Sequence, residues 1–186
     1  LANHYMYVVA APNQVIRDRM MRFQDAKVGL EVIDIPETAQ RNIATLYEEN
    51  GQCVALVYLG DDGALLTVSV GGELYLARRV EISLGQLTTG LPPEQRDAQE
   101  KLVEELQRTL DHFERQYRTL PIGKLVLAPT PVAHELDFVL HEGLGLPVDT
   151  VDLKQVIDFP IDVDAKLQWT IFHTIGAALR IEQAAE

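Results

Sequence analysis

The residues with the most suggestive chemistry lie in one short stretch, where glycine, aspartate and a hydroxyl residue follow an apolar run. Gly60, Asp61, Asp62 and Gly63 separate two alternating apolar/polar runs, and Thr67 lies on the second run. The N–H groups of a tight turn, a hydroxyl group and a carboxylate can together surround a phosphate and its metal ion. The stretch therefore raises the question of a nucleotide site.

The carboxylate that such a site needs is not where the pattern requires it. Tyr58 stands two residues before Gly60, where a D-x-G motif would have its aspartate, and tyrosine cannot replace a metal-binding carboxylate. Asp61 and Asp62 lie beyond this glycine, where aspartate is favourable turn chemistry. Thr67 equally suits an ordinary strand position. We expect a turn here and not a catalytic site.

Other residue types give no convincing catalytic set. His134 and His141 share a face of a predicted helix, but about 10 Å of helix rise separates them, too far to hold one metal ion. Ser69 and Ser83 lie outside any G-x-S-x-G nucleophile motif. Cys53 is the single cysteine, so the chain cannot form an internal disulfide or a multi-cysteine zinc site. We expect no catalytic residue, no metal ligand and a reducing compartment.

Two further groups suggest contacts and not catalysis. Arg78 and Arg79 are adjacent on a predicted strand, so they point to opposite faces of the sheet. We expect one of them to form a structural ion pair, with contact to a partner protein as the alternative. Trp169, Phe172 and Ile175 lie on the last predicted helix. We expect this group to pack on the sheet, with an exposed docking face as the alternative.

Composition excludes several function classes. The 186 residues are 47% hydrophobic, which is ample for a buried core. Sixteen basic and 28 acidic residues give a formal net charge of -12, which repels a nucleic-acid backbone. No apolar run reaches the roughly 20 residues of a membrane-spanning helix, and no signal-peptide pattern begins the chain. We expect a soluble globule that neither binds nucleic acid nor spans a membrane.

The elements that must position these residues follow from the periodicity of the apolar side chains. The first part predicts strand, helix, strand and helix over Tyr5–Ala11, Asn13–Ala26, Leu30–Ile35 and Pro36 to about Glu49. From residue 52 to about residue 84, two glycine-containing turns predict three consecutive strands. The rest predicts helix, strand, helix, strand and helix over residues 94–117, 122–129, 132–145, 146–153 and 164–182.

Two of these helices carry an apolar stripe at helical spacing. In the helix over 94–117 the stripe consists of Leu102, Leu106, Leu110, Phe113 and Tyr117. In the last helix it consists of Leu167, Ile171, Ile175 and Leu179. We expect each stripe to mark the buried side of its helix.

The order β-β-β-α-β-α-β-α after residue 52 is that of the ribonuclease-H-like fold, the unit duplicated in actin-like proteins. Short turns force antiparallel neighbours and helical crossovers allow parallel ones, so we expect an α/β fold with a mixed sheet. We expect residues 1–49 to end a preceding lobe and residues 50–186 to form the second lobe. Because Leu1 enters an apolar run almost at once, we expect a fragment of a longer protein.

A succession of motifs resembles the second half of PilM-like proteins of type IV pilus assembly. The motifs are YVVAAPNQVIRDRMMRFQDAKVGLEVIDIPETAQRNI, VALVYLGDDGALLTVSVGGELYLARRVEISLG, LQRTLDHFERQY, GKLVLAPTPVAHELDFVLHEGLGLPVDTVDL and IGAALR. The strand with the paired arginines is most similar to the MshI branch of MSHA pilus biogenesis. The resemblance implies an actin-like and FtsA-like fold, with two lobes around a nucleotide cleft. It also implies a cytoplasmic protein, peripheral at the inner membrane.

The chain departs from the PilM pattern at the positions that would contact a nucleotide. The D-I-G of the first strand is Tyr-Leu-Gly at residues 58–60, and the L-x-G-G-G-A turn falls at residues 127–132. Pro129 and Pro131 remove N–H donors from that turn and stiffen it. The first-lobe phosphate loop would precede Leu1. The degenerate nucleotide positions are Tyr58, Gly60, Thr67, Pro129 and Thr130.

These departures favour a non-enzymatic assembly scaffold, similar in this respect to GspL, a secretion-system relative with an actin-like cytoplasmic domain. We expect no cofactor. The resemblance implies PilN-like inner-membrane assembly proteins as partners and membrane contact only through them, and a homodimer is a further expectation.

Two other functions stay open. One is an ATP-binding actin-like protein that uses ATP with magnesium as a switch, which Gly60, Gly63 and Thr67 support. The other is a ribonuclease-H-like nuclease, which would need acidic residues such as Asp34 and Asp61–Asp62 to converge. The acidic net charge opposes a nucleic-acid substrate.

Overall fold

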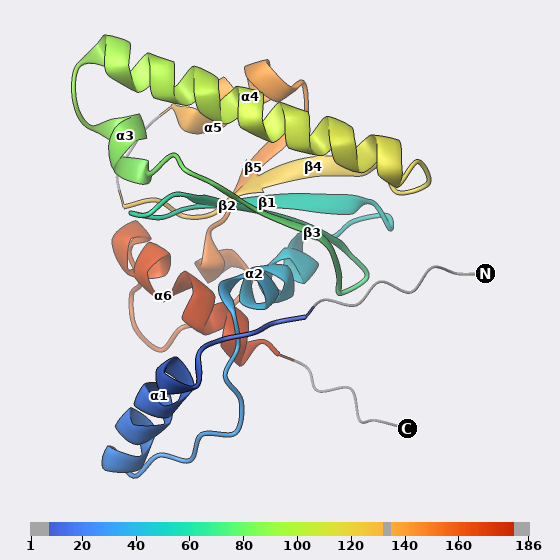
Figure 1. The fold of residues 1–186 in the computed structure, drawn as a ribbon. Helices are drawn as coiled ribbons and strands as arrows, with labels where there is room; N and C mark the ends of the chain where they lie inside the picture. The colour runs from blue at the N-terminus through green and yellow to red at the C-terminus, as the bar shows by residue number, and fades with distance from the viewer. Residues whose placement is uncertain (1–7, 132–134, 181–186) are drawn as a thin grey trace. The chain divides into compact units, whose positions relative to one another are not determined.

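The computed structural model describes residues 8–131 and 135–180 (Figure 1). The chain divides into two units, Leu1–Asp34 and Ile35–Glu186. In the first unit the predicted helix is present as α1 (Asn13–Asp25), and none of its residues is buried. The expected apolar side of α1 includes Met20 and Phe23, which are 44% and 40% exposed. The helix forms as predicted, but it has no core of its own.

The two strands predicted in the first part of the chain are wrong where the structure describes them. Residues 8–11 and 30–35 are extended or irregular and belong to no strand, whereas residues 5–7 lie outside the described part. A strand needs a neighbouring strand to satisfy its N–H and C=O groups. The described sheet pairs only strands that follow residue 52. An apolar alternating run was therefore not sufficient to make a strand.

The second unit contains a five-stranded sheet of order β3-β2-β1-β4-β5. The strands are β1 (Cys53–Leu59), β2 (Ala64–Val70), β3 (Glu73–Val80), β4 (Ile122–Leu127) and β5 (Val148–Thr150). β1 pairs antiparallel with β2, and β2 with β3, because tight turns connect them. β1 pairs parallel with β4, and β4 with β5. The predicted mixed sheet with three antiparallel strands is confirmed.

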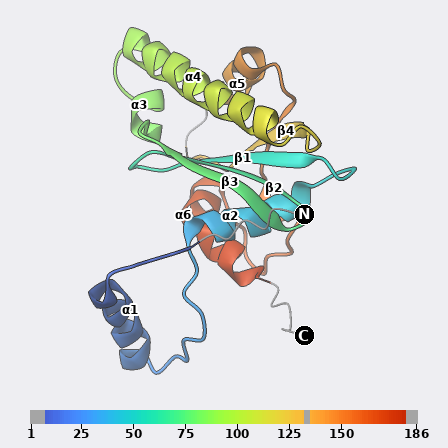
Figure 2. The ribbon, with the colours of Figure 1, turned by 45° about the vertical axis from the view of Figure 1, so that its right-hand side comes forward.

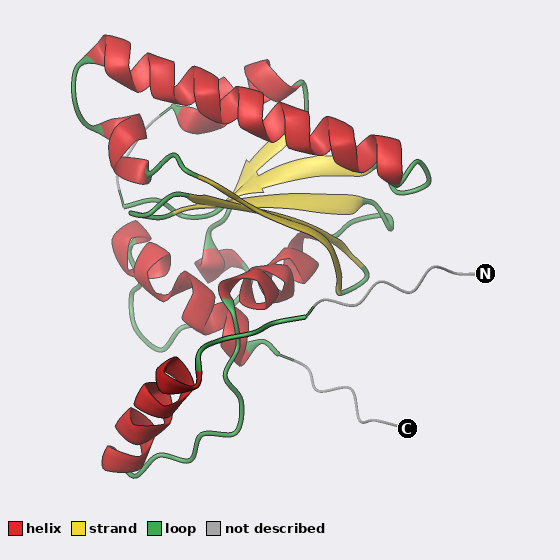
Figure 3. Cartoon of the chain, in the orientation of Figure 1, coloured by secondary structure: helices red, strands yellow, loops and turns green. Residues whose placement is uncertain are grey.

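Helices cover both faces of this sheet (Figures 1 and 2). One face carries α2 (Pro36–Ala44) and α6 (Ala165–Ala178), and the other carries α3 (Leu84–Thr88), α4 (Pro92–Gln116) and α5 (Leu136–Leu144). Short 3-10 turns at Thr45–Tyr47 and Leu153–Gln155 complete the unit (Figure 3). The sequence analysis missed α3, although Ser83 and Gln86 form a capping box at its start.

The helix α2 packs in the same unit as the sheet, although the sequence analysis assigned residues 1–49 to a preceding lobe. Gln40 of α2 is fully buried and donates hydrogen bonds to the backbone of β1 and β2. Asn42 of α2 donates to the carbonyl oxygen of Gly176 in α6 at 2.8 Å. The division between the two units falls between Asp34 and Ile35.

The central strand β1 has an apolar core on each side, and its successive residues alternate between the two. Cys53, Ala55, Val57 and Leu59 belong to the core beneath α4 and α5. Val54 and Leu56 belong to the core beneath α2 and α6, and Tyr58 packs against that core. Tyr58 is therefore on the α6 side of the sheet, which decides what it contacts.

The two predicted stripes have different outcomes. In α4, Leu102, Leu106, Leu110 and Phe113 are buried, as expected. In α6 the buried residues are Gln168, Phe172 and Gly176, whereas Leu167 of the predicted stripe is 36% exposed. Ile175 and Leu179 of the predicted stripe pack against the core but are only partly buried, because a glycine and a hydrogen-bonded glutamine, neither of them an apolar marker, lie on the most buried side of α6.

Candidate functional site

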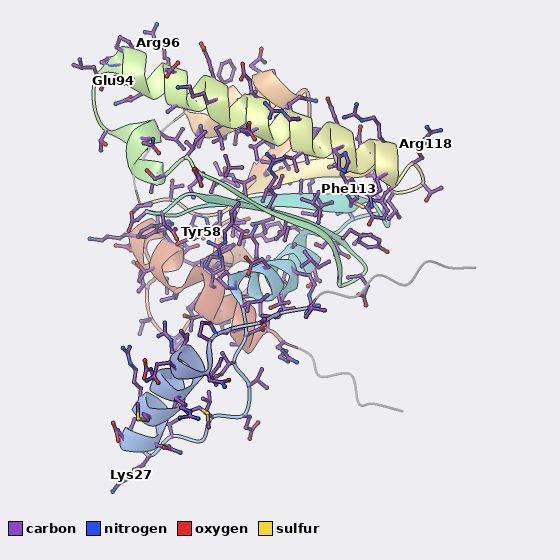
Figure 4. The ribbon with its side chains drawn as sticks, in the orientation of Figure 1. Lys27, Tyr58, Glu94, Arg96, Phe113 and Arg118 are labelled. Atoms are coloured by element: carbon purple, nitrogen blue, oxygen red, sulfur yellow. The ribbon has the colours of Figure 1, made fainter. Side chains whose placement is uncertain are left out.

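Tyr58 lies on the α6 side of β1 (Figure 4), in a cluster with aromatic side chains of α6. Its ring stacks with that of Trp169 at 6.2 Å between centroids and with that of Phe172 at 5.4 Å. The ring of His173 lies closer, at 4.4 Å and tilted by 57°. Three α6 side chains thus fill the space beside the position where a D-x-G motif would have its carboxylate.

Hydrogen bonds attach this cluster to the end of β1. The Trp169 Nε1 donates to the carbonyl oxygen of Leu59 at 2.7 Å, and the Tyr58 hydroxyl makes a longer contact of 3.4 Å with the carbonyl oxygen of Trp169. Burial, and secondarily the charges of Asp61 and Asp62, raises the pKa of Tyr58 to about 12. The side chain is therefore a neutral phenol at physiological pH and offers no negative charge to a metal ion. The prediction that the Trp169 group packs on the sheet is confirmed.

His173 is the one titratable group in the cluster with a strongly lowered pKa. Burial is the main cause and lowers the pKa to about 4, whereas the nearby charge of Glu37 opposes the shift and that of Arg79 adds to it. The buried Nε2 atom has no hydrogen-bond partner among the described residues. His173 is therefore neutral at physiological pH, and it contributes packing and not charge.

The hairpin between β1 and β2 has the tight shape that the sequence predicted. The Gly60 N–H donates to the carbonyl oxygen of Gly63 at 2.9 Å. Gly63 has a φ of 137°, and a Cβ atom there would lie 2.6 Å from the carbonyl oxygen of Val80, so the turn requires glycine. Asp61 and Asp62 are exposed at the tip of the hairpin. Their position agrees with ordinary turn chemistry.

Thr67 is fully buried on β2, where its hydroxyl takes part in a network around Gln40 of α2. The Gln40 Nε2 lies 3.0 Å from Thr67 Oγ1, 2.7 Å from the carbonyl oxygen of Leu56 and 3.0 Å from that of Leu65. Its Oε1 is buried without a hydrogen-bond partner among the described residues. The hydroxyl that could have contacted a phosphate thus helps to attach α2 to the sheet.

Pro129 and Thr130 line a pocket of about 450 Å³ at the carboxyl ends of β4 and β5. Because β1 and β4 are parallel neighbours, these residues follow β4 at the same edge of the sheet where Gly60 follows β1. The Ala128 N–H donates to the carbonyl oxygen of Val57 at 2.8 Å, so the segment after β4 lies beside the end of β1. Tyr58 does not line the pocket. The segments that follow β1 and β4 therefore lie at the same end of the sheet. Their surroundings differ, because Tyr58 contacts aromatic rings whereas Pro129 and Thr130 line the pocket.

The far wall of this pocket is built around a buried glutamine. Gln168 of α6 is 4% exposed, and its Nε2 donates to Asp152 Oδ1 at 2.9 Å. Its Oε1 accepts from the Leu153 N–H at 2.8 Å. The hydrogen bond from Gln168, followed by one from the Lys154 N–H, holds the pKa of Asp152 below its usual value. Asp152 is therefore an ionised carboxylate in a fixed orientation.

The charge distribution around the pocket is uneven. Asp137 and Asp152 contribute two carboxylates, and Lys154 contributes one ammonium group. The Lys154 Nζ lies 3.7 Å from Asp162 Oδ1, with both side chains largely exposed, and its charge also helps to lower the pKa of Asp152. The charged residues that line the pocket therefore differ by one negative charge.

The paired arginines of β3 point to opposite faces, and both find acidic partners. Arg78 lies 2.6 Å from Glu105 of α4, and Arg79 lies 3.1 Å from Glu37 of α2. The predicted structural ion pair is confirmed for Arg78 and extends to Arg79, whose second contact is 3.9 Å to Asp62. These half-exposed pairs link the edge strand to a helix on each face.

The remaining candidates do not form a catalytic set in the described part of the chain. The His141 Nδ1 lies 2.8 Å from the carbonyl oxygen of Leu146, whereas His134 lies outside the described residues. Cys53 is buried, and burial raises its pKa to about 11. Over residues 8–131 and 135–180, no group of three or more histidine, cysteine or acidic residues is placed to hold a metal ion. None of the described helices is long and apolar enough to cross a membrane.

Three functional candidates were missed by the sequence analysis: Gln40, Gln168 and His173. Each is a polar residue on a helix face that packs on the sheet. For Gln168 a signal was available, because it precedes the buried Phe172 and Gly176 at steps of four residues. For Gln40 the signal was weaker, since its neighbours on α2 are a mixture of small and polar residues.

The chain was compared with known proteins. No family model and no curated protein sequence matches it. Among solved structures, a chain of the PilM-PilN type IV pilus biogenesis complex is similar over 91% of this chain, with 18% identity and a TM-score of 0.65. The ethanolamine utilization protein EutJ from Carboxydothermus hydrogenoformans is similar over 91%, with 15% identity and a TM-score of 0.52.

These likenesses concern the fold. The chain covers 57% of the length of the PilM-PilN complex chain and 62% of that of EutJ. Nearly all of the present chain is aligned in both cases, so the similarity includes the sheet and the helices on both its faces. The chain has a PilM-like, actin-like fold.

Proposed function

We propose that this chain is part of a non-enzymatic scaffold of type IV pilus assembly, which docks PilN-like inner-membrane assembly proteins without using a nucleotide. The likeness to a chain of the PilM-PilN complex supports the pilus assembly role. The MshI-like assignment and a position at the inner face of the membrane are finer parts of this proposal. They rest on the sequence resemblance alone.

The observation that carries the nucleotide-independent part of the proposal is the packing of Tyr58. The D-x-G carboxylate position holds a neutral phenol, and α6 contributes Trp169, Phe172 and His173 around it. A hydrated magnesium ion needs oxygen ligands and room for several waters. An aromatic cluster supplies neither. Pro129 and Pro131 add to the argument, because they remove backbone donors that an anion would use.

The second candidate is an ATP-dependent switch, and one observation favours it. The Gly60–Gly63 hairpin is a tight glycine-containing turn, and the backbone N–H groups of such turns can bind anions. Gly60 lies at the same sheet edge as the pocket beside Pro129. A nucleotide would then have to bind without a carboxylate at position 58.

Two measurements test the proposal. Isothermal titration with Mg-ATP is expected to give no saturable heat, either with this chain or with a longer protein that contains it. Co-purification of that protein with a PilN-like partner is expected to give a stable complex whose yield does not change with ATP. Micromolar affinity for Mg-ATP would contradict the nucleotide-independent scaffold and support the ATP-dependent switch. Failure to form the complex would contradict the pilus assembly role.

A further inference from the structure

The loop between α2 and β1 contains the one Asn-Gly pair of the sequence, Asn50-Gly51. The two residues form the centre of a tight turn, in which the Gln52 N–H donates to the carbonyl oxygen of Glu49 at 3.0 Å. The φ angles of Asn50 and Gly51 are 54° and 68°, so both residues have the positive φ of a type I′ turn. Both are exposed to solvent. Water therefore has access to the whole pair.

The groups that asparagine uses to form a ring with the next residue are not engaged in this turn. Over residues 8–131 and 135–180, no hydrogen bond holds the Asn50 side-chain amide or the Gly51 N–H. The hydrogen bond that closes the turn uses the oxygen of Glu49 and the N–H of Gln52 instead. Glycine has no Cβ atom, so no side chain hinders the approach of the Gly51 nitrogen to the Asn50 Cγ, and the backbone can adopt the conformation that this approach needs. Asparagine is one of the thermolabile residue types, and this position leaves it unprotected.

Asn42 of α2 is the contrasting case. It is 7% exposed, and its Nδ2 donates to the carbonyl oxygen of Gly176 at 2.8 Å. Its Oδ1 accepts from Arg41 at 2.7 Å. The next residue, Ile43, is β-branched, buried and inside the helix. Ring formation at Asn42 would require α2 to unwind and the amide to leave both partners, so the structure protects this asparagine.

We propose that Asn50-Gly51 is a site of spontaneous deamidation, which produces isoaspartate and aspartate at position 50. The Gly51 nitrogen loses its proton and attacks the Asn50 Cγ. As the new N–Cγ bond forms, the Cγ–Nδ2 bond breaks and the side-chain nitrogen leaves as ammonia with that proton. Water then opens the resulting succinimide ring. Breakage of the bond to the backbone carbonyl carbon gives isoaspartate, and breakage of the bond to Cγ gives aspartate. Water is the only co-reactant.

Isoaspartate would disturb two contacts that the same loop makes with the sheet. The Glu48 Oε2 accepts from the Gly71 N–H, in the turn between β2 and β3, at 2.7 Å. The Glu49 Oε1 accepts from the Lys124 Nζ of β4 at 2.7 Å, and the Lys124 side chain is only 14% exposed. Isoaspartate adds one methylene group to the backbone between these glutamates and Cys53, the first residue of β1. Both carboxylates would therefore move relative to the strands that they contact.

Mass spectrometry of the incubated chain tests the reaction. Trypsin releases residues 42–78 as one peptide, because no lysine or arginine lies between Arg41 and Arg78, so Asn42 serves as the internal control. In water enriched in oxygen-18 we expect the heavy isotope to enter at position 50 and not at position 42, and to enter faster at mildly alkaline than at mildly acidic pH.

A synthetic peptide of residues 46–54 gives the rate without the fold. We expect the folded chain to react within about tenfold of this rate, because opening an exposed turn costs little free energy. Conversion of the peptide with no conversion at position 50 of the folded chain would overturn the proposal, and so would equal conversion at positions 42 and 50 of the folded chain.

Two variants test the consequence for the fold. Asn50→Gly keeps a residue that accepts positive φ but removes the amide, so we expect only the parent to accumulate acidic forms in ion-exchange chromatography. Asn50→Asp, measured when fresh, adds the charge without the extra methylene and is expected to unfold close to the fresh parent. The isoaspartate fraction of the parent is expected to unfold about 2–4 °C lower. Acidic forms that accumulate equally in Asn50→Gly would overturn the site, and an isoaspartate fraction as stable as the fresh parent would overturn its effect on the two contacts.

Discussion

The indole Nε1 of Trp169 lies 2.7 Å from the carbonyl oxygen of Leu59, the last residue of the central strand. This hydrogen bond holds α6 against the end of β1, next to Tyr58. The ring of Trp169 also stacks on that of Tyr58, with an interplanar angle of 9°. Trp169 therefore packs against Tyr58 and also attaches α6 to the end of β1.

Replacing Trp169 by phenylalanine tests this anchor. The variant keeps an aromatic ring but loses the donor and part of the packed indole, so we expect the free energy of unfolding to fall by about 1–3 kcal/mol. Tyr58→Phe is the matched control, because its hydroxyl contact is 3.4 Å long and its loss is expected to cost less than about 0.5 kcal/mol. Urea unfolding followed by far-UV circular dichroism measures both. An equal effect of the two variants would show that the indole hydrogen bond has no special weight.

Tyr58→Asp restores the residue type of a D-x-G motif. We expect it to destabilise the fold by about 3 kcal/mol or more, because it removes a packed ring and places a carboxylate among aromatic side chains. We also expect no Mg-ATP binding by isothermal titration. A Tyr58→Asp variant that is as stable as its parent and binds Mg-ATP would mean that the site lacks only its carboxylate.

Gln40→Leu tests the buried attachment of α2 to the sheet. The amide nitrogen has two hydrogens for its three neighbouring acceptors. Thr67→Val therefore leaves two carbonyl acceptors for both hydrogens and is expected to cost less than about 1 kcal/mol. Gln40→Leu removes the donor from the two strand carbonyls and is expected to cost about 1–2 kcal/mol. Thermal unfolding measures the stability of both variants. A larger loss in Thr67→Val than in Gln40→Leu would contradict this order of effects.

Gly176→Ala tests the close approach of α6 to α2. A Cβ atom at Gly176 would collide with the carbonyl oxygen of Ala39, and backbone atoms cannot yield without moving a helix. We expect a loss of about 1–3 kcal/mol. At Gly85, inside α3, a Cβ atom meets only ordinary contacts of 3.8 and 3.9 Å, so Gly85→Ala is expected to be neutral or stabilising by up to about 1 kcal/mol. Differential scanning calorimetry compares the two, and a tolerated Gly176→Ala would contradict the packing.

His173 predicts a pH dependence of stability. Its pKa is about 4 in the folded chain, against an ordinary value of 6.5, so the unfolded chain binds more protons between these pH values. The contribution of the neutral imidazole is therefore complete above pH 6.5 and is lost as the pH falls towards 4. His173→Phe is expected to lose less stability than its parent between pH 7 and pH 5 in urea unfolding. Identical slopes for the two proteins would exclude His173 as the titrating group.

Apart from α3, the elements after residue 52 could be predicted because their signals are local. Alternation in β1 and β2, glycine at the two turns and the apolar stripe of α4 each depend on neighbours within a few residues. The same locality explains the failures at residues 8–11 and 30–35. An alternating apolar run specifies a strand only when a second strand is available to pair with it.

From the sequence, only the presence of residue types that do not suit a nucleotide site could be recognised. Tyr58 and Pro129 can be recognised in the sequence as residues that lack the chemistry of a carboxylate and of a glycine turn. What surrounds them depends on residues far along the chain, since Trp169 and Gln168 come from the last helix. The spacing of residues within α6 does not reveal that Trp169 bonds to Leu59 or that Gln168 bonds to Asp152.

The sequence by itself determined most of the α/β order, the antiparallel meander and the residue types that stand at positions 58–60 and 127–132, because these are properties of residue type and short-range spacing. Only the tertiary structure decided that Tyr58 is enclosed by aromatic rings, that Gln40 links α2 to two strands, and that Gln168 orients Asp152. These relationships join side chains over long sequence separations. Packing geometry sets them, and the pattern of one segment does not contain that geometry.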